Sequence, residues 1–211
     1  MGKESAAGTR RRGGRGARER ILVAAAALFY EEGIHATGIA RLVETAEVST
    51  RTFYQHFPTK AALVEEYLRG YEAGLARRVE ERLTQEGLAP QDQLLTLFVM
   101  VAEAGSERPG GASTRGCPLH NAAVEAADQM PEVRELVQRN KEGVVQQLTD
   151  IAARGGAADP ERLGRQLAVL LEGATAMSTS LDNPCPRQDA LDAARILIDQ
   201  ALPDMQSRQR S

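Results

Sequence analysis

The feature that most constrains the fold of this chain is the spacing of its apolar residues, which recur every three or four positions in most segments from Arg18 to Leu202. This spacing matches the turn of an α-helix, and no stretch of useful length alternates with the two-residue period of a half-buried strand. Glycine and proline interrupt the pattern between segments, for example at Gly155-Gly156 and Asn183-Pro184. The sequence therefore predicts an all-α fold.

Local signals set the expected helix boundaries. Ser49 and Thr59 are favourable N-cap residues, and Gly33 can adopt the left-handed conformation that closes a helix. With these signals, helices are expected at residues 18–33, 39–46, 50–56, from 60 onward, 90–106, 117–128, 131–154, 160–182 and 187–202.

The chain divides into three predicted parts. Residues 1–16 are rich in Gly, Ser, Ala and Arg and are predicted to form a disordered arm. Residues 17–64 form a compact N-terminal domain, and residues 65–205 form a larger helical domain. The arginines of the arm allow two interpretations. The arm either contacts DNA flexibly, along the phosphates or in a minor groove, or it is a solubilising tail without a defined contact.

Several functional classes are disfavoured by what the sequence lacks. It has no apolar run of about 18 residues and no secretory signal core, so we expect a cytoplasmic protein without a membrane span. The two cysteines, Cys117 and Cys185, make neither a disulfide framework nor a zinc site. Nucleotide-binding loops, dinucleotide fingerprints and hydrolase elbows are also missing. We therefore expect no enzyme, no cofactor and no metal.

Charge is distributed unevenly along the chain. Residues 1–60 hold ten Lys/Arg and six Asp/Glu, whereas the whole chain has a net charge of −3. A basic N-terminal part on an acidic body indicates that one end of the molecule meets a polyanion.

Two short helices joined by a tight turn, after a supporting helix, are typical of a helix-turn-helix. The second of them, residues 50–56, carries Thr50, Arg51, Thr52 and Gln55 on its predicted outer face and Phe53 on its inner face. The N-terminal residues of such a helix face base edges in the major groove. The sequence therefore predicts a double-stranded DNA binder.

Residues 18–65 resemble the N-terminal domain of the tetracycline-repressor (TetR) family. The matching positions are the run Arg20–Phe29, Gly33, Ala36-Thr37, Leu42-Val43, Ala46, Val48-Ser49, Thr52–Lys60 and Leu63. This resemblance implies a helix-turn-helix domain followed by a helical domain that dimerises and binds a small-molecule effector. It also implies a repressor released from a palindromic operator by that effector.

The resemblance implies roles for individual residues. Thr37, Tyr54, His56 and Lys60 are expected to contact phosphates, and Thr50, Arg51, Thr52 and Gln55 are expected to approach base edges. Two positions depart from the family pattern, because Glu47 and Arg51 stand where many members have glycine. A non-glycine residue in a left-handed turn costs about 1 kcal/mol, so Glu47 leaves the fold intact.

Two apolar stripes near the C-terminus are the predicted homodimer interface of a four-helix arrangement. They comprise Leu163, Leu167, Leu170, Leu171 and Ala174, and Leu191, Ala194, Leu197, Ile198 and Leu202. The alternative is that both stripes pack inside one monomer.

The effector pocket is predicted among the middle helices of the second domain. Its expected residues are Phe98, Val101, Cys117, Leu119, His120, Asn121, Glu125, Val145, Leu148 and Met177. Because Phe98 is the only aromatic residue after Tyr71, an aromatic cage is disfavoured and a mostly apolar or amphipathic ligand is expected. The same stripes also fit an ordinary core. Cys117 fits either a buried inert thiol or a sensor of oxidants and electrophiles, and a regulator governed by a protein partner remains a third possibility.

Overall fold

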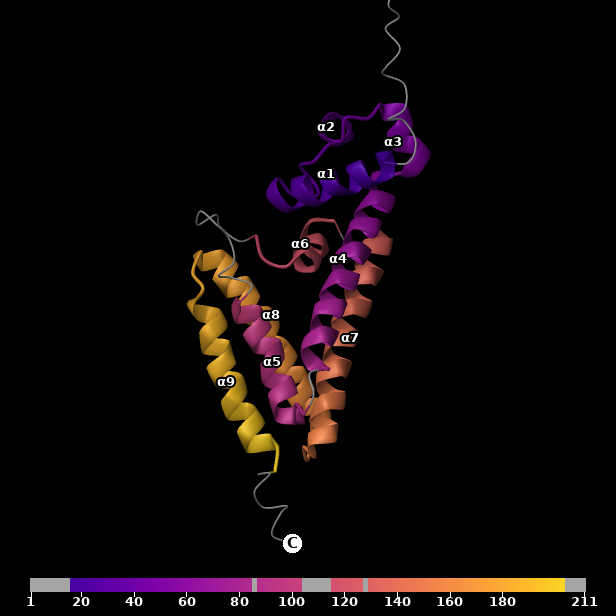
Figure 1. The fold of residues 1–211 in the computed structure, drawn as a ribbon. Helices are drawn as coiled ribbons and strands as arrows, with labels where there is room; N and C mark the ends of the chain where they lie inside the picture. Colours follow the sequence, from indigo (N-terminus) through magenta and orange to yellow (C-terminus); the bar gives the residue numbers. More distant parts are fainter. Residues whose placement is uncertain (1–15, 85–86, 104–114, 127–128, 204–211) are drawn as a thin grey trace, which may run out of the picture.

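The protein was analysed as a computed structural model that describes residues 16–84, 87–103, 115–126 and 129–203. Within these residues the chain forms nine α-helices and no strand (Figure 1). The helices are α1 (Ala17–Glu31), α2 (Ile39–Thr45), α3 (Thr50–His56), α4 (Lys60–Leu83), α5 (Pro90–Glu103), α6 (Pro118–Glu125), α7 (Pro131–Gly155), α8 (Pro160–Leu181) and α9 (Cys185–Ala201). The all-α prediction is confirmed, and the observed boundaries differ from the predicted ones by a few residues.

Local chemistry accounts for the helix boundaries. The hydroxyl oxygens of Ser49 and Thr59 accept from the backbone N–H groups of Thr52 and Ala62 at 3.0 Å, which caps α3 and α4 as the sequence predicts. Glu47, in the turn before α3, has φ of +50°. The turn therefore has the left-handed backbone that glycine would supply, although a glutamate occupies it.

The molecule is built as a small helical cap on a longer bundle (Figure 1). Helices α1, α2 and α3 lie at one end, and α4 leads from them along α7 toward the other end. Helices α5 and α8 pack beside α7, and α9 packs on α5 and α8. This arrangement puts α3 at an end of the molecule, away from α5, α8 and α9.

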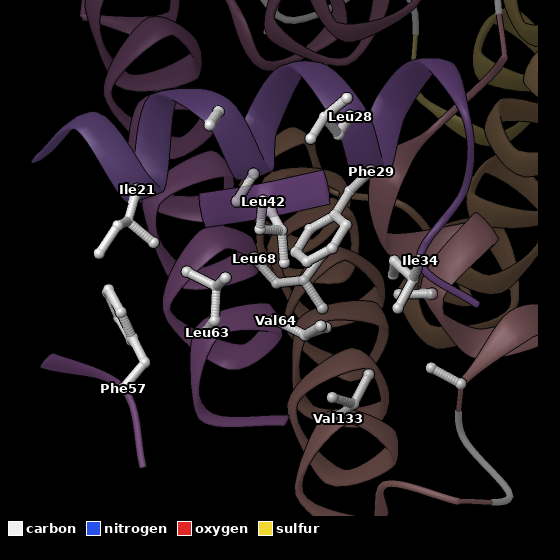
Figure 2. Packing of buried hydrophobic residues seen from close by; sticks show 14 of the residues in the cluster. Ile21, Leu28, Phe29, Ile34, Leu42, Phe57, Leu63, Val64, Leu68 and Val133 are labelled. Carbon is white, nitrogen blue, oxygen red and sulfur yellow. The ribbon is translucent and has the colours of Figure 1, made fainter. Parts of the chain in front are cut away.

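Two hydrophobic cores hold the helices together. The first joins α1–α4 to α6 and the start of α7, and Figure 2 shows Phe29, Leu42 and Val64 meeting in it. The second lies between α5, the later part of α7, α8 and α9. The first core therefore crosses the predicted domain boundary at residue 64. Because the core is close-packed, a displacement of α6 would also displace side chains of the N-terminal helices.

Helices α7 and α8 approach each other closely at Gly164. A Cβ on Gly164 would lie 2.9 Å from the Thr149 backbone nitrogen. Because backbone cannot swing aside, only glycine permits this helix contact.

Two predicted segments, the N-terminal arm and the end of the second domain, include residues that the structure does not describe. Residues 1–15 of the predicted arm and residues 204–205 at the predicted end of the second domain are outside the described residues. In the described part of the chain, no helix is both long enough and apolar enough to cross a membrane. The same residues contain no group of three or more His, Cys, Asp and Glu that could hold a metal ion.

Candidate DNA-binding surface and effector cavity

Helix α3 presents one bare polar face and one buried face. Phe53 is fully buried and packs against Phe57, with ring centroids 6.1 Å apart. Thr50, Arg51 and Gln55 are exposed on the opposite side. Burial of the aromatic residues fixes the orientation of α3, so the exposed donors form a surface that can enter a DNA groove.

The remaining predicted contacts on α3 are less exposed. Thr52 is partly buried, and its hydroxyl lies 2.8 Å from that of Ser49 in the helix cap. His56 is also partly buried, at the last turn of α3. Tyr54 is 51% exposed, and its ring meets Phe53 edge-on at 5.4 Å. One part of Tyr54 is therefore packed against Phe53, and the other half of its side chain is open to solvent.

Thr37 does not lie on this surface. Its side chain is fully buried, and its hydroxyl donates to the Gly33 carbonyl oxygen at 2.6 Å. A hydroxyl that closes the α1–α2 turn from inside cannot reach a phosphate. We therefore remove Thr37 from the expected DNA contacts and assign it a structural role.

Lys60 sits where α4 meets the α1–α2 turn. Its Nζ donates to the His35 carbonyl oxygen at 3.4 Å. Burial lowers the pKa of Lys60 from its ordinary value, and the nearby Glu125 carboxylate opposes this shift. Lys60 therefore lies between the DNA-binding helices and α6.

Two arginines of α1 support the DNA-binding surface, and the helical pattern alone did not assign them this role. Arg20 Nε donates to the Ala46 carbonyl oxygen at 3.0 Å, which ties α1 to the turn before α3. The Arg18 guanidinium lies 5.4 Å from the centre of the Phe57 ring and pairs with Glu66 at 2.7 Å. Recognising either role requires the three-dimensional position of its partner.

A cavity of about 240 Å³ lies between α6, with the segment before it, and the second half of α8. Its lining residues are Arg115, Gly116, Cys117, His120, Asn121, Val124, Glu125, Glu172, Thr175, Ala176, Thr179 and Ser180. Gly116 has φ of +76°, and a Cβ there would lie 2.8 Å from Thr179 Oγ1. Glycine thus allows the segment before α6 to approach α8 closely at the wall of the cavity.

The cavity brings together only part of the predicted pocket. Cys117, His120, Asn121 and Glu125 line it. Phe98, Leu119 and Leu148 are instead closed inside the two cores, Val101 and Val145 are partly buried elsewhere, and Met177 is 52% exposed. The aliphatic residues fill space between helices because close packing leaves no room beside them for a ligand. The predicted pocket is corrected accordingly.

Glu125 joins the cavity to the DNA-binding helices. Its Oε2 accepts from the backbone N–H groups of Ile34 at 2.7 Å and His35 at 3.3 Å. Arg115, also in the lining, donates to the carbonyl oxygen of Glu31 at 2.8 Å and lies 3.8 Å from Glu125. Both charged side chains therefore line the cavity, and they also contact the N-terminal domain, Arg115 at the end of α1 and Glu125 in the turn that follows it.

Cys117 is half-buried at the N-cap of α6 and faces Tyr71 of α4. Burial raises the pKa of Tyr71, and the charge and hydrogen bonding of the Cys117 side chain raise it further. The thiol is thus in contact with both the cavity and the long helix that leads to α3.

The two predicted dimer stripes lie mostly inside the chain. Leu163, Leu167, Ala174, Leu191, Ala194 and Ile198 are buried in the second core, and Leu170, Leu171, Leu197 and Leu202 pack partly against it. The strongly exposed apolar side chains of α8 and α9 are Val169, Met177, Leu181 and Ile196. A partner that binds these helices would cover this second set, because the buried set has almost no free surface.

An exposed helix-turn-helix at one end of an all-helical chain defines a DNA-binding regulator. A family model described as "Bacterial regulatory proteins, tetR family" matches residues 21–67, and one described as "Tetracyclin repressor-like, C-terminal domain" matches residues 90–194. The chain belongs to the TetR family of transcriptional regulators, which confirms the resemblance seen in the sequence.

Named relatives agree with this assignment. The HTH-type transcriptional repressor KstR2 of Mycolicibacterium smegmatis is 26% identical over 59% of this chain and 58% of its own length. KstR2 of Mycobacterium tuberculosis is 32% identical over 41% of this chain and 43% of its own length. The chain thus matches about half of the length of these two repressors.

Solved structures show the same architecture. SCO4454, a TetR-family transcriptional regulator from Streptomyces coelicolor, superposes with a TM-score of 0.79 at 28% identity, covering 88% of this chain and 95% of that one. The reduced form of Escherichia coli NemR superposes with a TM-score of 0.76 at 22% identity, covering 90% and 100%. At that identity the second likeness concerns the fold alone.

Proposed function

We propose that this chain is a repressor that binds a palindromic DNA operator as a homodimer and leaves it when a small molecule binds the second domain. The observation that carries the proposal is the exposed face of α3, where Arg51 and Gln55 project beside Thr50. Arginine and glutamine form bidentate pairs with base edges in the major groove. One α3 reads only a few base pairs, so two copies related by a two-fold axis would read a near-palindromic site.

The surface proposed for the dimer is the outer face of α8 and α9. Val169 is 71% exposed and Ile196 58% exposed, although both are large apolar residues on helices that are otherwise well packed. A Cβ added at Gly173, between Val169 and Met177 on α8, would meet nothing within 4 Å. A second copy would bury these residues in a four-helix contact.

Binding selection from a pool of random duplexes tests the DNA part of the proposal. The expected product is a near-palindrome with half-site centres about one helical turn, or a small multiple, apart. Sedimentation of the complex is expected to show an even number of chains per duplex. Recovery of no preferred sequence, or of an asymmetric site bound by one chain, would contradict the proposal.

The ligand part of the proposal rests on the cavity between α6 and α8 and on its contacts with the end of α1. An effector releases DNA only if it binds the DNA-free arrangement more tightly than the bound one. Operator DNA must then weaken effector binding by the same factor. Calorimetric titration of a screened ligand, with and without the selected duplex, measures this coupling.

Cys117 supports a second candidate trigger, because its thiol lines the same cavity. If thiol oxidants or electrophiles alone release the DNA, and Cys117→Ser abolishes that release, modification of Cys117 replaces ligand binding as the switch. Release by a non-reactive ligand in Cys117→Ser would exclude this trigger.

A further inference from the structure

The turn between α1 and α2 forms a small anion-binding concavity. Gly33 has φ of +99°, and the backbone N–H groups of the next two residues, Ile34 and His35, donate to the same oxygen. Successive N–H groups that converge in such a turn attract negative charge. The acceptor is Glu125 Oε2 of α6, at 2.7 Å from the Ile34 nitrogen and 3.3 Å from the His35 nitrogen. A carboxylate of the second domain therefore occupies an anion site built from the backbone of the DNA-binding domain.

The turn and the carboxylate fit each other closely. A Cβ on Gly33 would lie 2.8 Å from Glu125 Oε2 and 3.3 Å from its Oε1. Another residue at position 33 would be strained by the positive φ and would also push the carboxylate out of the turn. Glycine thus permits both the conformation of the turn and the close approach of Glu125.

A second contact, of opposite polarity, lies beside the first. Arg115 donates to the carbonyl oxygen of Glu31, the last residue of α1, at 2.8 Å. The last carbonyl groups of a helix have no partner within the helix, so this guanidinium satisfies an acceptor that α1 leaves open. The same guanidinium lies 3.8 Å from the Glu125 carboxylate. Two neighbouring charged side chains are thus bound to backbone groups on either side of the end of α1.

Apolar packing is the other main contact between α6 and the DNA-binding helices. Leu119 and Ala122 of α6 lie in the same core as Phe29 and Ile34. Burial of apolar surface holds helices together without a preferred direction. Hydrogen bonds weaken steeply when their distance or angle changes. The hydrogen bonds made by Glu125 and Arg115 therefore restrict the orientation of α1 on α6 more than the apolar packing does.

We propose that Glu125, with Arg115 as its partner, is a positioning residue for DNA binding. Its carboxylate holds the α1–α2 turn, and through α1 it holds the packed helices α2 and α3, in a fixed orientation on the second domain. This inference rests on the proposed repressor and names the contact through which its second domain controls DNA binding. Without that contact the orientation of α3 must be fixed anew when DNA binds, which costs affinity. Because Glu125 also lines the cavity, an effector that displaces its carboxylate weakens DNA binding.

Hydrogen exchange on the full chain without DNA tests the contact. Glu125→Ala removes the acceptor, so the Ile34 and His35 amides are expected to exchange about tenfold faster or more. Glu125→Gln keeps an oxygen that can accept from the same amides and is expected to give a smaller change. Glu161→Ala removes an exposed carboxylate from the first turn of α8, outside the lining, and should leave both rates unaltered. Equal rates in Glu125→Ala and the natural chain would overturn the proposal.

Titration of the selected duplex tests the positioning role. Glu125→Ala is expected to bind the duplex about tenfold more weakly, and Glu125→Gln is expected to recover part of this loss. Gly164→Ala is the control for a purely structural effect, because it disturbs the α7–α8 contact instead. It should lower the unfolding free energy but leave the affinity of the folded chain for DNA unchanged. If Glu125→Ala exchanges faster and yet binds DNA as tightly as the natural chain, Glu125 holds the turn without positioning α3, and the proposal is wrong.

The two measurements separate this inference from the proposed repressor. If the natural chain selects no duplex, the proposed repressor fails, whatever the exchange rates of the turn. If the natural chain selects a duplex but Glu125→Ala changes neither exchange nor affinity, the repressor stands and the positioning role of Glu125 fails. Faster exchange together with weaker binding in Glu125→Ala, and in neither control, supports both.

Discussion

Helix α3 and the α8–α9 pair differ in how much of their surface is packed. In α3 a single aromatic side, led by Phe53, meets the rest of the protein, and the other side is bare. Helix α8 packs against α7 and α9, with Leu163 and Leu167 buried and Val169 exposed. In a short helix packed on one side, residue type alone predicts whether a side chain is buried or exposed. In a helix packed on two sides it does not, because apolar residues point toward more than one neighbour.

This difference explains why most residues predicted for the DNA-binding face are exposed, whereas most residues predicted for the dimer interface are buried. The polar face predicted for residues 50–56 is exposed, apart from Thr52 and His56, which are partly buried. The apolar stripes predicted for the dimer are largely core. The regular stripe is the one that packs inside the monomer, and the isolated exposed residues, such as Ile196, carry the proposed contact between copies.

The largest expected effect comes from charging the outer face of α8 and α9. The double change Val169→Glu with Ile196→Glu is expected to weaken dimerisation by about 3 kcal/mol or more, because carboxylates would be buried without partners. Sedimentation equilibrium measures the dimer dissociation constant. Val23→Glu, at a 66% exposed position on α1, is the control and should leave the dimer intact. If the double variant dimerises as tightly as the natural chain, the dimer interface does not lie on the outer face of α8 and α9.

Gly164→Ala tests the packed side of the same helix. The added methyl group would meet the Thr149 backbone nitrogen at 2.9 Å, so a loss of about 1–3 kcal/mol in unfolding free energy is expected. Chemical denaturation gives this value. Gly70→Ala in α4, where nothing lies within 4 Å of the added Cβ, should instead stabilise by about 0.5–1 kcal/mol. If both glycines tolerate alanine equally, the close α7–α8 approach is wrong.

On the α3 face, loss of a base contact should differ from loss of a phosphate contact. Arg51→Ala or Gln55→Ala is expected to cost about 1–3 kcal/mol on the selected duplex and little on random DNA. Lys60→Ala is expected to weaken binding to both and to lower the salt dependence by about one contact. Titrations with both duplexes at several salt concentrations separate these results. Equal losses on both duplexes in all three variants would remove α3 as the sequence reader.

Thr37→Val gives the smallest expected effect and separates an interior residue from a surface one. Removing the hydroxyl that donates to Gly33 should cost about 1 kcal/mol of unfolding free energy. The salt dependence of DNA binding should stay the same, unlike in Lys60→Ala. A reduced salt dependence in Thr37→Val would restore Thr37 to the phosphate contacts.

The sequence alone determined the helices of this protein and the identity of its DNA-binding segment. Both depend on short-range physics, namely the 3.6-residue period, the caps at Ser49 and Thr59 and the turn at Gly33. The sequence also showed a glutamate, Glu47, in place of glycine in the turn. Glu47 adopts a positive φ there, a conformation that is more strained for glutamate than for glycine. Such features require no knowledge of what lies across the fold.

The tertiary structure alone decided which apolar residues are core and which polar residues meet. Thr37 follows the family pattern, yet it is buried, because its partner Gly33 lies inside the α1–α2 turn. Glu125 contacts Ile34 across 91 positions of sequence, and no periodicity relates residues so far apart. This contact depends on how α6 packs in the first core beside the α1–α2 turn, and packing is set by the shape of all the helices together.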